Sequence, residues 1–121
     1  MNKQKTIKLD AHGKEIELTL LASSYSSNGN LAVLSYDAQT HEPFQNVTVN
    51  LDFLCPGYAY LDTNNFPDIK DALEKLGIIK DERRQTRSGY VSYPLVQFDI
   101  GVLKQYVMPD SDYFMLAGEE D

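Results

Sequence analysis

Short runs in which apolar and polar residues alternate constrain this chain more than any other feature of its sequence. The first two runs lie on either side of a turn-forming segment at 10–14, and their alternating apolar residues are Ile7, Leu9, Ile16, Leu18 and Leu20. A period of two is typical of a half-buried strand. We therefore predict a β-hairpin with strands near 5–10 and 15–22.

The next two runs predict a second hairpin. Residues 31–36 form a more continuously apolar run, and residues 44–53 alternate again after the turn at 41–43. One face of the second run is apolar throughout, through Val47, Val49, Leu51 and Phe53. The four runs together predict a four-stranded antiparallel meander.

A helix is expected near 67–76, after a short strand at 58–62. Its apolar residues recur at helical spacing, as Ile69, Ala72, Leu73 and Leu76. Pro67 suits the first turn, Asn65 or Thr63 can cap the free N–H groups, and Gly77 is a natural stop. We read the charged segment that follows, 80–89, as a loop.

The rest of the chain predicts one more strand and one short helix. Residues 90–98 resemble a strand, and Pro94 places it at a sheet edge or at a bulge. Asp99 is expected to cap the helix, and the apolar patch 113–116 to dock on the core. The predicted fold class is α+β, with an antiparallel β-sheet of about five strands packed with one or two short α-helices. We expect one domain over 1–121, with a basic N-terminal end and an acidic tail at about 117–121.

Composition limits the kinds of partner. The 18 acidic and 11 basic side chains give a net charge of −7, which disfavours generic binding to bare phosphate backbone or to a membrane surface. The negative charge either favours binding to a basic partner or only keeps the protein soluble. Cys55 is the one cysteine, lies among apolar residues, and is expected to be a buried small hydrophobe in a reducing compartment. With no signal-like or membrane-spanning apolar run, we expect a cytoplasmic protein.

The sequence holds no motif for a catalytic, metal or cofactor site. His12 and His41 lie in predicted turns without partners at metal-ligand spacing. We therefore expect no enzyme activity and no cofactor, with a metal-dependent nuclease built on Asp62 and neighbouring acids as the alternative.

Three segments are candidate binding sites. Asp62, Asn64 and Asn65 present carboxylate and amide groups together, although we favour a strand-to-helix junction with Asx turns. Arg83, Arg84 and Arg87 can grip phosphate or carboxylate groups, or can be a solvated loop paired with neighbouring acids. Tyr90 and Tyr93 near these arginines are either a protein- or RNA-contact surface or ordinary cross-strand packing.

Two stretches carry a resemblance to a known family. They run from Tyr60-Leu61-Asp62-Thr63-Asn64-Asn65 to Ser88-Gly89-Tyr90-Val91-Ser92-Tyr93-Pro94, and the match extends over about 28–103. The chain resembles a family of small uncharacterised proteins carried on conjugative elements, plasmids and phages of Firmicutes and related gut bacteria. Small acidic accessory proteins in that setting often counter host defence.

This setting, the net charge of −7 and the lack of a catalytic motif together favour an anti-CRISPR protein that binds a type II RNA-guided nuclease and blocks guide-RNA loading or DNA binding. An aromatic patch around Tyr90 and Tyr93 would add hydrophobic contact. Acidic side chains of the tail and of the helix, Asp68, Asp71 and Glu74, would stand in for phosphates in the basic channel of such a nuclease. The alternative is an accessory protein of conjugation or replication that contacts nucleic acid through Arg83, Arg84 and Arg87.

Overall fold

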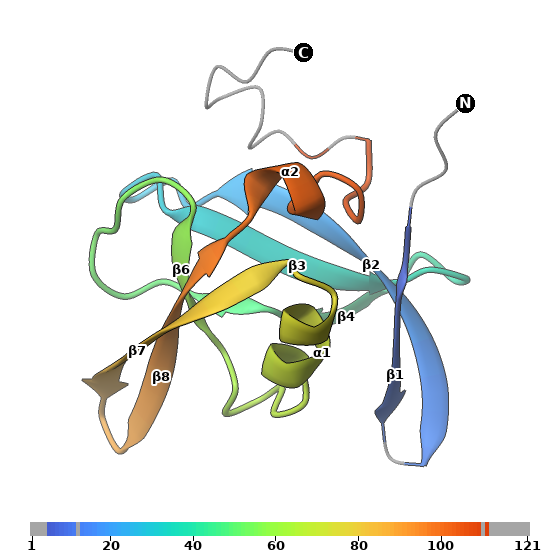
Figure 1. Ribbon diagram of the computed structural model, residues 1–121, viewed down its shortest axis with the longest axis horizontal. Helices are drawn as coiled ribbons and strands as arrows, with labels where there is room; N and C mark the ends of the chain where they lie inside the picture. Colours follow the sequence, from blue (N-terminus) through green and yellow to red (C-terminus); the bar gives the residue numbers. More distant parts are fainter. Residues whose placement is uncertain (1–4, 12, 110, 112–121) are drawn as a thin grey trace.

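The computed structural model describes residues 5–11, 13–109 and 111, and the predicted α+β fold class is confirmed. Within these residues the chain forms two four-stranded antiparallel sheets and two short helices (Figure 1). The first sheet has the strand order β1-β2-β3-β4, built from β1 (Ile7–Ala11), β2 (Lys14–Ser24), β3 (Leu31–Asp37) and β4 (Pro43–Asn46). The predicted meander is therefore present.

The second sheet has the order β5-β6-β8-β7. Its strands are β5 (Thr48–Val49), β6 (Tyr58–Leu61), β7 (Ile79–Ser88) and β8 (Val91–Phe98). The described part of the chain therefore has more strands than the expected five, and they divide between two sheets.

The chain passes from one sheet to the other at Val47. This residue is fully buried, its N–H donates to the carbonyl of Val33 and its carbonyl accepts from the N–H of Asp62, each at 2.9 Å. The single strand predicted over 44–53 is therefore wrong. It is β4 in one sheet and β5 in the other, and beyond Val49 the chain leaves the sheets, which leaves Phe53 72% exposed.

The loop predicted at 80–89 is also wrong, because β7 occupies it. Backbone pairing with β8 runs from Ile79 opposite Phe98 to Ser88 opposite Val91. The expectation for Pro94 holds in part. Strand β8 is internal where it pairs with β6, but that pairing ends at Leu95, so Pro94 has β7 alone as a partner.

The two helices confirm most of the local prediction. Helix α1 (Ile69–Lys75) buries Ile69 and Leu73 completely, and Gly77 follows it with φ of 75°. Its N-cap is Asp68, without a side-chain cap bond, so the expected capping by Asn65 or Thr63 is wrong. Helix α2 (Ile100–Leu103) is capped by Asp99, whose Oδ1 accepts from the N–H of Val102 at 3.1 Å, as predicted.

Both sheets and both helices contribute to one buried apolar cluster in the described chain. It joins Leu20 and Val33 of the first sheet to Leu61 and Val96 of the second. Cys55 is exposed, so its predicted burial is wrong; it lies in the loop that leaves the sheet after β5. The patch expected at 113–116 lies outside the described residues.

Candidate binding surface on the β7–β8 hairpin

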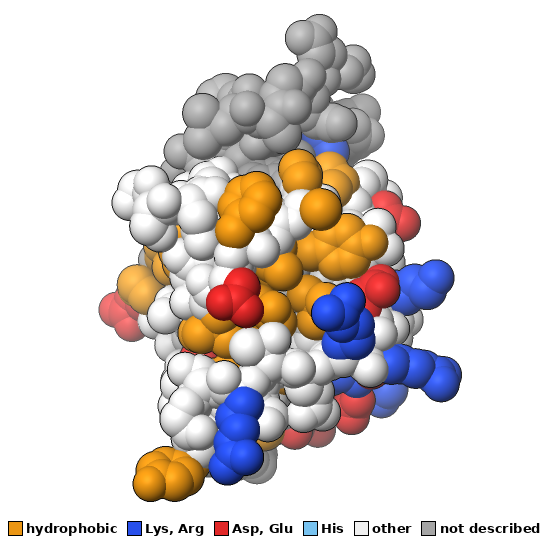
Figure 2. Space-filling view, turned by 90° about the vertical axis from the view of Figure 1, so that its left-hand side faces the viewer, with side chains coloured by type: hydrophobic (Ala, Val, Ile, Leu, Met, Phe, Trp, Pro, Cys, Tyr) orange, Lys and Arg blue, Asp and Glu red, His pale blue; other side chains and the backbone are white. Residues whose placement is uncertain are grey.

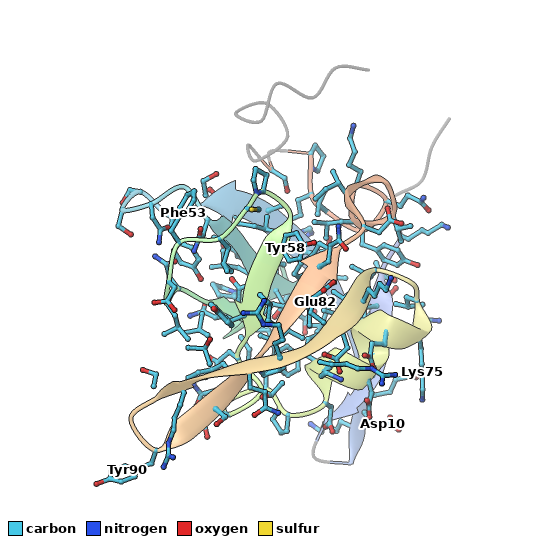
Figure 3. The ribbon with its side chains drawn as sticks, turned by 60° about the vertical axis from the view of Figure 1, so that its left-hand side comes forward. Asp10, Phe53, Tyr58, Lys75, Glu82 and Tyr90 are labelled. Atoms are coloured by element: carbon cyan, nitrogen blue, oxygen red, sulfur yellow. The ribbon has the colours of Figure 1, made fainter. Side chains whose placement is uncertain are left out.

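The β7–β8 hairpin projects from the body of the molecule and presents an aromatic ring at its tip (Figures 1 and 3). A two-residue connection, Gly89-Tyr90, joins the strands between the paired residues Ser88 and Val91. Gly89 adopts φ of 65°, which glycine tolerates without steric cost. Tyr90 is 97% exposed and points away from the body.

The register of the second sheet gathers three tyrosines on its outer face, away from the apolar cluster. Tyr58 pairs with Gln97, Tyr60 with Leu95, and Tyr93 with Thr86. Directly opposed residues share a face, and residues two apart along a strand do too. We call the surface made by Tyr58, Tyr60, Tyr93 and Leu95 the tyrosine face.

Side-chain contacts hold the tyrosine face together. The Thr86 hydroxyl and the Tyr60 hydroxyl lie 2.9 Å apart across β7, β8 and β6. Tyr60 and Leu95 are buried, whereas Tyr58 and Tyr93 are half-buried. Figure 2 shows hydrophobic side chains gathered on the side of the molecule where β6 and the hairpin lie, with both basic and acidic side chains among and beside them.

The three predicted arginines all lie exposed on β7, but they do not form one cluster. A bulge inserts Glu82 and Arg83 between the paired positions of β7, and Arg83 adopts φ of 59°. Arg84 lies opposite Leu95, on the tyrosine face. Arg87 lies opposite Ser92, on the other face, and its Nε donates to the carbonyl of Gly89 at 3.2 Å.

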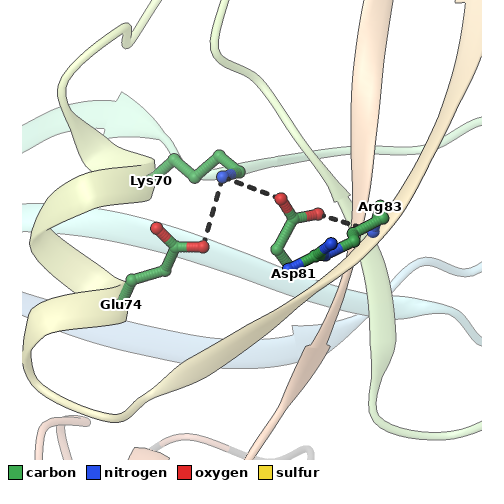
Figure 4. A network of polar contacts seen from close by, with 4 residues as sticks. All are labelled: Lys70, Glu74, Asp81 and Arg83. Atoms are coloured by element: carbon green, nitrogen blue, oxygen red, sulfur yellow. Dashed lines mark hydrogen bonds and ion pairs between the residues drawn. The ribbon is translucent and has the colours of Figure 1, made fainter.

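A polar groove of about 670 Å³ lies between α1 and the hairpin, and Arg84 contributes to its lining along the β7 edge. Lys70 on α1 bridges Glu74, at 3.2 Å, and Asp81 on β7, at 3.1 Å (Figure 4). The other Asp81 oxygen accepts from the N–H of Arg83 at 2.8 Å. This bond and the Lys70 ammonium hold the pKa of the Asp81 carboxyl below its ordinary value. The network joins the helix to the start of the bulge.

The Asp62 segment is a structural junction. Asp62 is 7% exposed, and its carboxylate accepts from the backbone N–H of Asn65 at 3.3 Å and from the side-chain amide of Asn65 at 3.1 Å. Asn64 is exposed and lies in the turn. The favoured interpretation, an Asx turn that leads into the helix, accounts for these contacts.

The acids predicted on the helix differ in whether they form an ion pair within the protein. Asp68 and Asp71 are exposed, and with Asp10 of β1 they line a groove of about 610 Å³. Glu74 instead pairs with Lys70. Two of the three predicted helix acids are therefore available to a partner.

Two kinds of feature, a metal-binding group and a membrane-spanning helix, are absent from the described residues. Within 5–11, 13–109 and 111, no group of three His, Cys, Asp or Glu residues is placed to hold a metal ion. None of the helices in that part of the chain is long and apolar enough to cross a membrane.

Sequence reasoning missed Tyr58, Phe53 and the Lys70–Asp81 bridge. Tyr58 belongs to a predicted strand, but its place on the tyrosine face depends on pairing with β8. The bridge joins Lys70 of the predicted helix to Asp81, which was predicted to lie in a loop. No local pattern predicts either contact, because the first depends on the pairing of β6 with β8 and the second on the strand β7, which forms by pairing with β8.

The fold and this surface define a small α+β protein that exposes an aromatic and basic β-hairpin. The chain belongs to the family described as a domain of unknown function, DUF4313, which matches residues 19–116 and so includes the whole hairpin. No curated protein and no solved structure matches the chain.

Proposed function

We propose that this protein is a non-enzymatic inhibitor of host defence, encoded on a mobile element, that binds a type II RNA-guided nuclease. The observation that supports a binding role most directly is the hairpin tip, where Tyr90 is 97% exposed beside Arg87. Tyrosine and arginine are the residues most enriched at the energetic centres of interfaces. A fully exposed tyrosine contributes little to the stability of the fold, so contact with a partner explains its position better than packing does.

The acidic surface supports the choice of partner. RNA-guided nucleases hold their nucleic acids in positively charged channels. The exposed carboxylates Asp68, Asp71 and Asp10 line one groove, to which Lys8 and Lys75 also contribute. The net charge of −7 complements a positively charged channel. The proposed inhibitor occupies the channel and blocks guide-RNA loading or DNA binding.

The test is an order-of-addition experiment with a purified type II nuclease. The protein is titrated into a target-DNA cleavage reaction before or after the guide RNA. Inhibition only when the protein is added first indicates blocked guide loading, and inhibition in both orders indicates blocked DNA binding or cleavage. Full cleavage in both orders with a panel of such nucleases counts against the proposal.

Charge reversal tests the carboxylate contact. We expect D68K/D71K to weaken inhibition by about tenfold or more, because each reversal replaces an attraction by a repulsion. The control E15K/E42K makes the same change in net charge at two exposed acids outside the helix. Equal losses in the two variants would show that net charge alone matters.

A second candidate is a nucleic-acid-interacting accessory protein of conjugation or replication. One observation favours it: from Arg83 to Phe98 the chain has three arginines and no acidic residue, on an otherwise acidic protein. A gel shift at low salt that detects no binding would remove this candidate.

A further inference from the structure

We propose that the β7–β8 hairpin binds single-stranded nucleic acid directly, with Tyr90 stacked on a base and Arg84 and Arg87 on flanking phosphates. The inference deepens the proposed function, on which it rests for its setting in a complex that contains guide RNA. It names the chemistry that the hairpin contacts, and it is tested with free oligonucleotides.

Positive charge at the tip of the hairpin contrasts with the acidic rest of the molecule. From Arg83 to Phe98 the hairpin carries three arginines and no acidic residue. The two acids of the hairpin, Asp81 and Glu82, lie near the start of β7, where Asp81 pairs with Lys70. The tip therefore favours an anionic partner, which the acidic body repels. The hairpin projects from the body (Figure 3), so a ligand bound at its tip would lie away from the acidic body.

The arginines lie along one edge of the sheet. Strand β7 is the last strand of its sheet in the described chain, so its edge is open. Arg84 lies on the tyrosine face and Arg87 on the opposite face, and both are exposed. At about 3.3 Å per residue they stand roughly 10 Å apart along the strand. A flexible anionic chain that follows this edge can reach both guanidinium groups.

The aromatic rings near the arginines favour a nucleic acid without a complementary strand as the anion. Tyr90 offers a free ring at the tip, and Tyr93 lies half-buried on the same face as Arg84. Basic side chains that follow a backbone, with aromatic rings on which bases stack, are the general means of binding single strands. A duplex hides its base faces, so the rings would add little to its binding.

The test measures fluorescence anisotropy of labelled oligonucleotides of one mixed sequence: single-stranded RNA, single-stranded DNA and duplex. We expect both single strands to bind more tightly than the duplex. A difference between RNA and DNA would show a contact to the 2′-hydroxyl. The logarithm of affinity should fall with the logarithm of salt at a slope of about −1.4, because the two arginines on phosphates displace about 0.7 counterions each.

Matched variants locate the contact. Y90A should weaken binding by about fivefold or more, the loss of one base stack, and Y90F should retain it. F53A removes another exposed aromatic side chain and should bind normally. R84A/R87A should flatten the salt slope, whereas K8A/K14A, the same change in net charge on exposed lysines of β1 and β2, should not.

Each outcome decides the proposal. No anisotropy change with either single strand at low salt, up to about 100 µM protein, overturns it. Binding that Y90A leaves intact also overturns it, and circular dichroism confirms that Y90A is folded. If the wild-type protein inhibits the nuclease but binds no oligonucleotide, and Y90A loses inhibition, the proposed function stands and the nucleic-acid contact is wrong. If the wild-type protein binds single strands but inhibits no nuclease, the nucleic-acid contact stands and the proposed function is wrong.

Discussion

Arg83 adopts a left-handed backbone conformation inside a strand, with φ of 59°. For an L-residue this costs about 1–2 kcal/mol, and it persists only where the surroundings hold it. Here the N–H of Arg83 donates to Asp81, and β8 pairs on both sides of the bulge. The bulge is therefore a stable feature of the hairpin, and it places Arg84 opposite Leu95 where pairing with β8 resumes.

The first prediction separates the strain at Arg83 from its charge. Both R83A and R83G remove the guanidinium, but only glycine tolerates the positive φ. We expect the free energy of unfolding of R83G to exceed that of R83A by about 1 kcal/mol in urea titrations. Equal stabilities would mean that the bulge relaxes in solution.

The second prediction concerns Asp81 and pH. The backbone N–H of Arg83 and the Lys70 ammonium stabilise the carboxylate, so its folded-state pKa lies below the ordinary value of 3.8. A depressed pKa adds stability above that value, which is lost as pH falls through the folded-state pKa. We expect D81N to be less stable than the wild type at pH 7, by less than about 1 kcal/mol for so accessible a pair. Urea titrations should show this difference shrinking below pH 3.8.

At the scale of elements, the loop between β5 and β6 is held by one buried amide. Asn30 is 5% exposed; its Nδ2 donates to the carbonyl of Asp52 at 2.8 Å, and its Oδ1 accepts from the N–H of Leu54 at 2.9 Å. These bonds fix both sides of Phe53. The loop therefore keeps a defined path although its largest side chain faces solvent.

The third prediction removes this anchor. N30A removes both bonds to the backbone of the loop, and we expect it to cost about 1–2 kcal/mol of unfolding free energy, because the two backbone groups are only partly buried. Chymotrypsin should then cut after Phe53 or Leu54 much faster than in the wild type. The control N28A removes one side-chain bond, to the N–H of Asn30, and should leave the loop resistant. Equal cleavage of N30A and the wild type would contradict the anchoring role.

The hairpin illustrates how an edge strand is kept from pairing with other chains. Strand β7 is long, but charged side chains and a bulge interrupt its open edge. Such features discourage edge-to-edge aggregation. The same charges supply the phosphate contacts proposed for Arg84 and Arg87, so one composition serves both solubility and binding.

At the scale of the whole molecule, the two sheets share one core in the described chain. Leu61 of β6 is fully buried and belongs to the cluster that includes Leu20 of β2. The chain crosses between the sheets at Val47, whose backbone bonds to both. Neither sheet can lose its partner without exposing this core.

The fourth prediction follows from the shared core. L61A should lower the free energy of unfolding by about 2–5 kcal/mol, the range for a buried leucine. Far-UV circular dichroism, which reports the strands, and near-UV circular dichroism, which reports the tyrosines, should shift together in urea. Two separated transitions would mean that the sheets unfold independently.

The sequence by itself determined the local elements. Period-two alternation located the first strands, helical spacing located the helix that ends before Gly77, and Asp99 marked the start of the second helix. These signals are local because a strand or helix that faces one core repeats its apolar residues at a fixed period. Tyr90 and the three arginines were also found as candidates from their types and spacing.

Tertiary structure alone decided the rest. The crossing at Val47 and the strand at Ile79–Ser88 depend on pairing with partners distant along the chain. The charged sequence of β7 has no apolar period of its own, so only the register with β8 makes it a strand. That register also separates Arg84 from Arg87 and places Arg84 beside the tyrosines. Long-range hydrogen bonding between strands determines which side chains share a face, and the local sequence pattern does not predict this pairing.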